Sequence, residues 1–175
     1  QFIQPNASAV TLNRVVGGVP SSLNGTLSAN GRVYLINPSG ILVGPTGRIN
    51  TAAFVASTLD VPDGEFLAGE NMRFTGASLE GVVNLGIITA AEGDVILMGR
   101  SVENAGTINA PNGVAALAAG SDILMRAAGD ERVVINAGNA GGGKGVTNSG
   151  AINAAQAELK AAGGNVYELA VNNTG

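Results

Sequence analysis

Short apolar runs recur along the chain, and Gly, Asn, Pro or Asp bounds nearly all of them. Few stretches place apolar residues three and four apart without an intervening Gly or Pro, so the pattern favours strands over helices. Strands this short suit the side of a solenoid coil better than a β-sandwich. The expected strands are residues 32–36, 41–43, 54–59, 82–83, 87–89, 95–98, 114–118, 123–126, 133–135 and 166–169.

A second pattern is a repeat of Asn, any residue and Gly. Its four copies are Asn84-Leu85-Gly86, Asn104-Ala105-Gly106, Asn148-Ser149-Gly150 and Asn173-Thr174-Gly175. Successive Asn positions lie 20, 44 and 25 residues apart, and the middle gap equals two periods, one of them undecorated or interrupted by a loop. A period of this size is typical of a solenoid, in which each coil buries its apolar face against its neighbours.

The repeat also has a mechanical interpretation. Asn tolerates the left-handed backbone region, and its amide can bond the equivalent Asn of the next coil, while Gly allows a second bend. In three copies an isoleucine follows two residues after the Gly, at Ile88, Ile108 and Ile152. Each unit therefore predicts a coil corner followed by the first core residue of the next strand, with Asn84, Asn104, Asn148 and Asn173 at the corners.

Two segments depart from the simple repeat. Residues 154–162 contain helix-favouring Ala, Gln, Glu, Leu and Lys, but they follow a repeat copy directly, so we expect a strand and a turn. Residues 122–145 break the period with a charged stretch and then a run of almost only Asn, Ala and Gly. We expect a β-hairpin excursion at about residues 121–145 that closes on a Gly-rich loop.

Composition narrows the chemistry. The chain has 175 residues, of which 45% are apolar and 27 are Gly, with no Trp, as suits a core of stacked aliphatic side chains. There is no Cys and no His, which removes disulfides, thiolate chemistry, and the commonest general base and metal ligand. The net charge is −4 and the nine Lys and Arg residues are scattered, which argues against nucleic-acid binding. No apolar run is long enough to predict a membrane span.

Residues 1–60 carry four motifs in a fixed order. They are Asn13-Arg14-Val15, a Gly-X-Leu-X-Ala-Asn-Gly step that ends at Asn30-Gly31, Asn37-Pro38-Ser39-Gly40-Ile41, and Ala56-Ser57-Thr58-Leu59-Asp60. In these the chain resembles the N-terminal secretion domain of filamentous-haemagglutinin-like exoproteins, the secreted partners of two-partner secretion systems in Gram-negative bacteria. The family motif has Asn where this chain has Ser39. The family domain also begins upstream of Gln1, so we expect a fragment of a longer exoprotein, truncated at its N-terminus.

The resemblance implies a fold and a role. The family fold is a right-handed parallel β-helix, recognised in the periplasm by the POTRA domains of a cognate outer-membrane transporter. The implied role is a non-enzymatic secretion-targeting module, without cofactor or metal, of an exoprotein that is secreted or reaches the cell surface through the periplasm. Such exoproteins are commonly adhesins, which implies host receptors for the full-length protein. The turn at Asn37, Pro38, Ser39, Gly40 and Ile41 is the candidate transporter-recognition motif, and the alternative is that it only shapes a coil corner.

These observations predict one all-β domain over residues 1–175: a right-handed parallel β-helix of roughly seven coils, by chain length over period, with a hairpin excursion. The expected core is Val33, Leu35, Ile41, Val43, Val55, Leu59, Ile88, Val95, Leu97, Ile108, Val114, Leu117, Ile152 and Val166.

Four other functions compete with secretion targeting. A carbohydrate-active β-helix enzyme needs paired carboxylates, for which the candidates are Asp60, Asp63 and Glu65 in one loop and Asp122, Arg126, Asp130, Glu131 and Arg132 in another; solvated loop charge explains both sets more simply. Residues 138–145 nearly match a phosphate-binding loop but have Gly145 where Ser or Thr must hold Mg²⁺. Calcium binding would need an Asp that the Gly-rich stretches lack. Direct adhesion to a host or surface glycan or protein is the main alternative.

Overall fold

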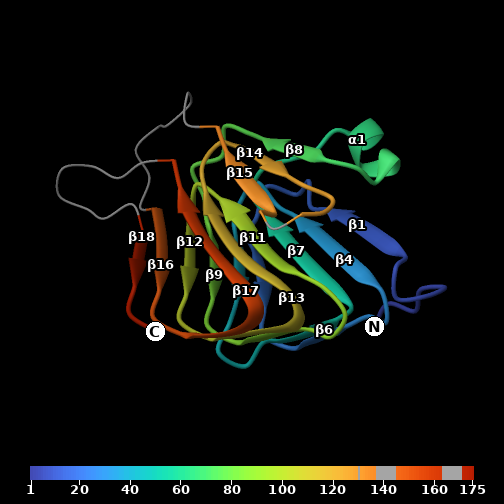
Figure 1. Cartoon of the computed structure of the whole chain (residues 1–175), viewed down its shortest axis with the longest axis horizontal. Helices are drawn as coiled ribbons and strands as arrows, with labels where there is room; N and C mark the ends of the chain where they lie inside the picture. The colour runs from blue at the N-terminus through green and yellow to red at the C-terminus, as the bar shows by residue number, and fades with distance from the viewer. Residues whose placement is uncertain (130, 137–144, 163–170) are drawn as a thin grey trace.

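The chain folds into a right-handed parallel β-helix (Figure 1). The structure is a computed structural model that describes residues 1–129, 131–136, 145–162 and 171–175. Short strands joined by tight corners wind around one axis, and each strand pairs in parallel with the equivalent strands of the coils before and after it. The described residues form six coils, against the roughly seven expected. The two numbers differ because two excursions use chain that a division of length by period assigns to coils.

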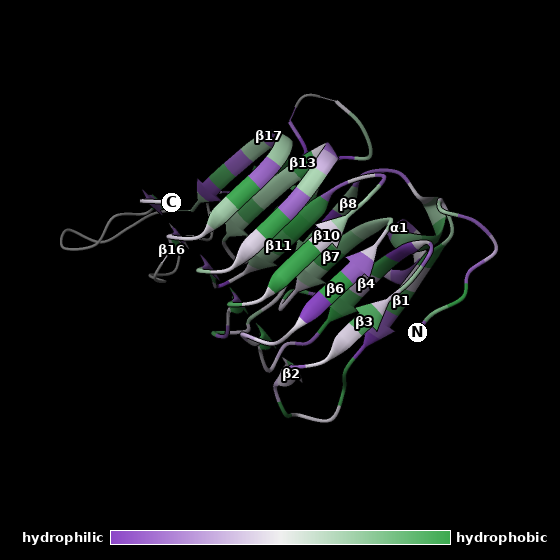
Figure 2. Ribbon diagram, turned by 90° about the horizontal axis from the view of Figure 1, so that it is seen from below, coloured by the Kyte–Doolittle hydropathy of each residue, from purple (hydrophilic) through white to green (hydrophobic). Residues whose placement is uncertain are grey.

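The coils have three faces. The first face is formed by β1 (Val10–Arg14), β4 (Arg32–Ile36), β7 (Ala53–Ser57), β11 (Val95–Gly99) and the later halves of β13 (Thr107–Ala119) and β17 (Ala151–Ala161). The second is formed by β2 (Ser21–Leu23), β5 (Ile41–Val43), β9 (Val82–Asn84), β12 (Ser101–Asn104), β16 (Gly145–Asn148) and β18 (Val171–Asn173). The third is formed by β3 (Thr26–Ser28), β6 (Arg48–Thr51), β10 (Ile87–Ala90) and the earlier halves of β13 and β17. Figure 2 shows this third face, with hydrophobic and hydrophilic residues alternating along β6 and β13.

Two excursions leave the helix and meet each other. The first contains α1 (Asp63–Ala68) and β8 (Met72–Thr75), and the second contains β14 (Asp122–Met125) and β15 (Val133–Ile135). Strand β14 pairs antiparallel with both β15 and β8. The β14–β15 pair is the hairpin expected in this region, and the addition of β8 makes it a three-stranded sheet that lies over the first face of the helix (Figure 1).

The buried hydrophobic side chains form two clusters, one on each side of the first face. Side chains that point into the coil, such as Val33, Leu97 and Leu117, stack with Ile88 and Ile108 in the main core. Their neighbours in sequence point outward and pack under the excursion sheet, where Phe74 and Ile123 are fully buried. Strands β7 and β11 are buried on both sides for this reason, which explains why they read as continuous apolar runs.

Most of the expected core is buried, with three differences. Val55 and Leu59 are 3% and 0% exposed, but they belong to the cluster under the excursion sheet and not to the interior of the coil. Val114 is only half-buried, because it lies where β13 bends and packs on that second cluster. Ile152 is half-buried too, since β17 pairs with β13 alone in the described part of the chain.

The expected strands otherwise match, and residues 154–162, expected as strand and turn, lie almost wholly within β17. The sequence missed α1, and the expected strands did not include β1, β2, β3, β6, β8, β12, β16 and β18. The expected strand at 166–169, the core residue Val166 and residues 138–144 of the Gly-rich loop lie outside the described residues. The extent of the domain stays a prediction.

Candidate functional site

The turn at Asn37–Ile41 connects the first face to the second. The Asn37 side chain is fully buried, and its Nδ2 donates to the Val19 carbonyl and the Ser21 hydroxyl, each at 2.9 Å. Its Oδ1 accepts the backbone N–H of Ser39 at 2.9 Å, which fixes an Asx turn. Gly40 has φ of 106°, a conformation that side-chain-bearing residues rarely adopt. Asn37 therefore ties the turn to the preceding coil, and Gly40 allows the chain to enter β5.

The folded turn exposes little of the motif. Pro38 is exposed and Ser39 is half-buried, whereas Asn37, Gly40 and Ile41 are buried. The Pro38 carbonyl accepts the hydroxyl of Ser78 at 2.6 Å, so the turn also anchors the segment that leads from the first excursion back to the helix. Any partner of the folded turn meets Pro38 and this neighbouring segment, not the Asn37 amide.

Two of the sequence motifs, far apart in the chain, meet through one arginine. The Arg14 guanidinium bonds the carboxylates of Asp60 and Asp63 at 2.7 and 2.5 Å, and it donates to the Val61 carbonyl. The hydrogen bond to Asp60 and then the one to Asp63 raise the pKa of Arg14 above its ordinary value. This contact fastens the start of the first excursion to β1. Asn13 has a smaller part, with its amide donating to the Tyr34 carbonyl at 3.3 Å.

The other motif residues also hold chain segments together. Asn30 and Gln4 exchange two hydrogen bonds of 2.7 Å, and the Gly31 N–H donates to Gln4 Oε1 at 3.0 Å. A Cβ at Gly31 would lie 2.5 Å from that oxygen, so the position requires Gly. Gln4, which the sequence did not single out, fixes the N-terminal segment across the first coil.

The fourth motif shapes the exit from β7. The Ser57 hydroxyl bonds the backbone of Leu59 on both sides, accepting from its N–H and donating to its carbonyl. The Thr58 hydroxyl donates to the Glu80 carbonyl at 3.0 Å, which ties the start of the first excursion to its end.

The corner Asn residues form a ladder through four coils. Nδ2 donates to the Oδ1 of the next coil at 2.7 Å in each of three steps, from Asn84 to Asn104, to Asn148 and to Asn173. The first three are nearly or fully buried, whereas Asn173 is exposed. Asn104 and Asn148 thus each accept a hydrogen bond from the Asn of the preceding coil and donate one to the Asn of the following coil, as the repeat predicted.

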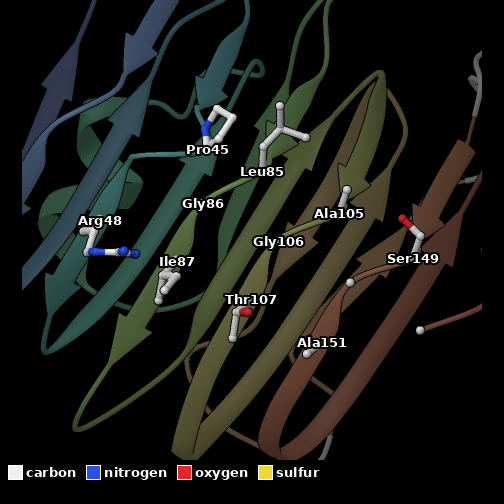
Figure 3. Close-up of a pocket in the computed structure, with 12 residues that line it drawn as sticks. Pro45, Arg48, Leu85, Gly86, Ile87, Ala105, Gly106, Thr107, Ser149 and Ala151 are labelled. Atoms are coloured by element: carbon white, nitrogen blue, oxygen red, sulfur yellow. The ribbon is translucent and has the colours of Figure 1, made fainter.

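The glycines of the same repeat stack against backbone. A Cβ at Gly106 would lie 2.2 Å from the Gly86 carbonyl oxygen, and one at Gly150 would lie 2.1 Å from that of Gly106. Figure 3 shows the result, with Leu85, Ala105 and Ser149 at equivalent places along a groove of about 550 Å³. The ladder and the glycine stack explain these residues by the fold alone.

The acidic and basic residues weighed as an enzyme site are engaged in structural contacts. Asp122 receives two hydrogen bonds from the Arg73 guanidinium, and Glu131 pairs with Arg126 and Lys160. Arg132 pairs with Asp94 at 2.5 Å, and its Nε donates to the Arg126 carbonyl at 2.9 Å. Glu65 accepts the Arg73 N–H, and Asp130 lies outside the described residues. Within the described residues, Asp60 and Asp63 share the Arg14 guanidinium, and Asp122 and Glu131 are held by other basic side chains, so these carboxylates serve structural contacts.

Comparison with known proteins identifies the family. The model of the TPS secretion domain matches residues 1–175. The chain belongs to this family. The crystal structure of the HMW1 secretion domain from Haemophilus influenzae superposes with a TM-score of 0.72 at 32% identity, covering 86% of this chain and 41% of that one. The chain is thus a secretion-targeting domain of an exoprotein and not an enzyme.

Two curated relatives are named heme/hemopexin-binding proteins, both from Haemophilus influenzae. One is 38% identical over 120 residues, and the other is 48% identical over 61 residues. The TPS secretion domain described here spans only 13% and 7% of their lengths. Among the described residues, no helix has the length and apolarity to cross a membrane.

Proposed function

We propose that this domain directs a large exoprotein to a cognate outer-membrane transporter by binding the transporter's periplasmic POTRA domains. The observation that carries the proposal is the family match over residues 1–175 on a fold that has no grouped catalytic residues among its described parts. A β-helix offers what such a role needs: a rigid, repetitive surface with exposed turns. The exoprotein then passes from the periplasm to the cell surface or the medium.

The turn at Asn37–Ile41 supports the proposal through its geometry. Its buried Asn37 and its Gly40 fix the path of the chain, while Pro38 faces solvent beside Ser78. We propose that Asn37, Ser39, Gly40 and Ile41 shape this surface and that the transporter contacts the exposed side of the turn.

We also propose that the full-length exoprotein is an adhesin or another binder of host molecules, with its binding activity outside these residues. The curated relatives bind haem or hemopexin by name. This chain has no His and no Cys, and its three Met, at positions 72, 98 and 125, are buried in the cluster under the excursion sheet. Tyr34 is 7% exposed as well, so the described residues offer no ordinary haem ligand at the surface.

The test is secretion of the full exoprotein from cells that contain or lack the transporter. We expect the exoprotein in the medium or at the surface only when the transporter is present. Export that is equal in both strains, or binding of host glycans by the isolated domain, would favour the adhesive solenoid instead.

A further inference from the structure

A groove opens on the second face of the helix, next to the Asn37–Ile41 turn. Its volume is about 560 Å³, and it lies over β9, β12 and β16. The residues that matter for recognition are Leu79, Glu80, Val83, Arg100, Glu103 and Thr147, and we refer to them as the Arg100 groove. Val83, Glu103 and Thr147 are adjacent in register on the outward side of three paired strands, so the floor of the groove is a flat parallel sheet.

Arg100 has no partner for its charge among the residues that the structure describes. Its side chain makes no ion pair or hydrogen bond within the described part of the chain, although its Nε is buried. Besides Arg100 Nε, only the Thr51 hydroxyl oxygen is a buried side-chain polar atom without a hydrogen bond in the described ranges. A buried, unsatisfied donor costs free energy, so such atoms in native proteins usually mark a missing partner.

The rest of the groove also offers unused contacts. Leu79 is 78% exposed at its edge, in a segment held by the hydrogen bonds of Ser78 to Pro38 and Glu80. Glu80 and Glu103 are exposed and make no ion pair among the described residues. An apolar edge beside an unpaired cation and two unpaired carboxylates is complementary to a peptide segment of mixed character.

The groove is continuous with the turn. Ser78 bonds the Pro38 carbonyl at 2.6 Å, and the Glu80 side chain lies next to Gly40. The turn thereby positions the chain that forms the edge of the groove. A fault in the turn would displace Leu79 and Glu80 even though Asn37 itself is buried.

We propose that the Arg100 groove is the docking surface for the transporter's periplasmic domain. The docked segment is extended, presents a carboxylate to the Arg100 guanidinium and places an apolar side chain against Leu79 and Val83. This proposal rests on the transporter role proposed above, and it extends the contact from the exposed side of the turn to the groove beside it.

The experiment measures secretion of the full exoprotein carrying single substitutions, in strains with and without the transporter. Leu79→Ser and Arg100→Gln test the groove. Leu67→Ser and Arg48→Gln are matched controls, because Leu67 is 81% exposed on α1 and Arg48 is exposed on β6 without an ion pair in the described ranges. A photo-crosslinking amino acid at position 79, compared with one at position 67, reports contact with the transporter directly.

We expect Arg100→Gln to reduce transporter-dependent secretion, since it removes a charge-assisted contact worth about tenfold or more in affinity, and Leu79→Ser to act in the same direction. Both controls should secrete normally, and crosslinks to the transporter should form from position 79 only. Thermal melting of the purified variants must match the unsubstituted domain, which separates loss of contact from loss of fold.

Two outcomes overturn the proposal in distinguishable ways. If secretion depends on the transporter but the groove variants behave like their controls, and position 79 forms no crosslink, the groove is not the docking surface and the targeting role stands. If the unsubstituted exoprotein is exported equally without the transporter, both the targeting role and the docking surface are wrong.

Discussion

The Asn ladder gives the sharpest test of how the coils are held together. Asn104 is fully buried, accepts the amide of Asn84 and donates its own amide to Asn148, both at 2.7 Å. The substitution Asn104→Asp keeps the shape and the acceptor but removes the donor. It also places a carboxylate oxygen against the Oδ1 of Asn148.

The expected loss of stability follows from these contacts. The missing hydrogen bond is worth about 1 kcal/mol, and leaving a buried acceptor unsatisfied costs a further 1–3 kcal/mol or so. The buried negative charge adds to this, although the Asn84 amide partly compensates it. We therefore expect Asn104→Asp to lower the free energy of unfolding at neutral pH by about 3 kcal/mol or more.

The loss should depend on pH in a defined direction. Burial beside another oxygen raises the pKa of the new carboxyl above that of the unfolded chain. The native state then holds a proton that the unfolded state releases, so stability falls as pH rises through this window. Once protonated, the introduced carboxyl regains a donor for the Oδ1 of Asn148. The difference from the unsubstituted protein should therefore shrink as the pH is lowered.

Denaturant unfolding at acid and neutral pH measures both effects. Asn153→Asp is the matched control, because Asn153 makes a similar amide bond of 3.0 Å to Asn109 on the exposed surface. The control should change stability by less than about 0.5 kcal/mol. Equal behaviour of the two variants would refute the claim that a buried ladder stabilises the corners.

Three further predictions test other parts of the account. Gly106→Ala should lower the free energy of unfolding by about 2 kcal/mol or more, because its Cβ would meet a backbone oxygen at 2.2 Å. The control Gly64→Ala in α1 places a Cβ with nothing within 4 Å, so it should leave stability unchanged or raise it. Equal melting temperatures of the two variants would contradict the glycine stack. Burial lowers the pKa of Lys160, but its hydrogen bonds to Glu131 and Glu158 raise that pKa overall above its ordinary value. The contribution of Lys160 to the stability of the fold is therefore full below the pKa of the unfolded state, and it is lost as the pH rises through the pKa of the folded state. Lys160→Met should therefore flatten the alkaline part of a melting profile, and an unchanged profile would argue against the pairing. Asn37→Ala should lower the free energy of unfolding by about 1–3 kcal/mol and reduce secretion, because it removes the hydrogen bonds of the buried amide. The control Pro38→Ala should leave the melting temperature unchanged. An Asn37→Ala variant as stable as the unsubstituted domain would show that the turn does not depend on this amide.

The coils could be predicted from sequence because their signals are local and repeated. Asn at a corner, Gly at the second bend and Ile as the next core residue recur in three coils, so Asn84, Asn104 and Asn148 reveal the period directly. In the first two coils Leu23 and Val43 hold the corner position, and the repeat is not visible there. The stacking of equivalent positions then turns a one-dimensional repeat into a ladder.

The excursions could not be predicted in the same way. Helix α1 has only six residues, too few to show a helical period, and β8 pairs with β14 about 50 residues later. Val55 and Leu59 were expected in the core and are buried, but nothing local shows that they face a second cluster. When a strand is covered on both sides, its sequence is apolar throughout and does not say which side faces the coil.

The candidate site was visible only in part. The Asn37–Ile41 motif marked the turn, but the burial of Asn37 and the role of Ser78 depend on contacts between distant segments. Arg14 and Asp60 were both singled out as motif residues, and their meeting across 46 positions had no local signal. Arg100 carried no signal at all, since an isolated arginine at the end of a strand reads as ordinary surface charge.

The most direct test of the targeting role is to fuse this domain, with any residues that precede it in its exoprotein, to an unrelated passenger protein. The amount of passenger in the medium is then compared between cells that contain and cells that lack the transporter. The account predicts export of the passenger only when the transporter is present, and loss of that export when the domain is removed. Equal export with and without the transporter would contradict it.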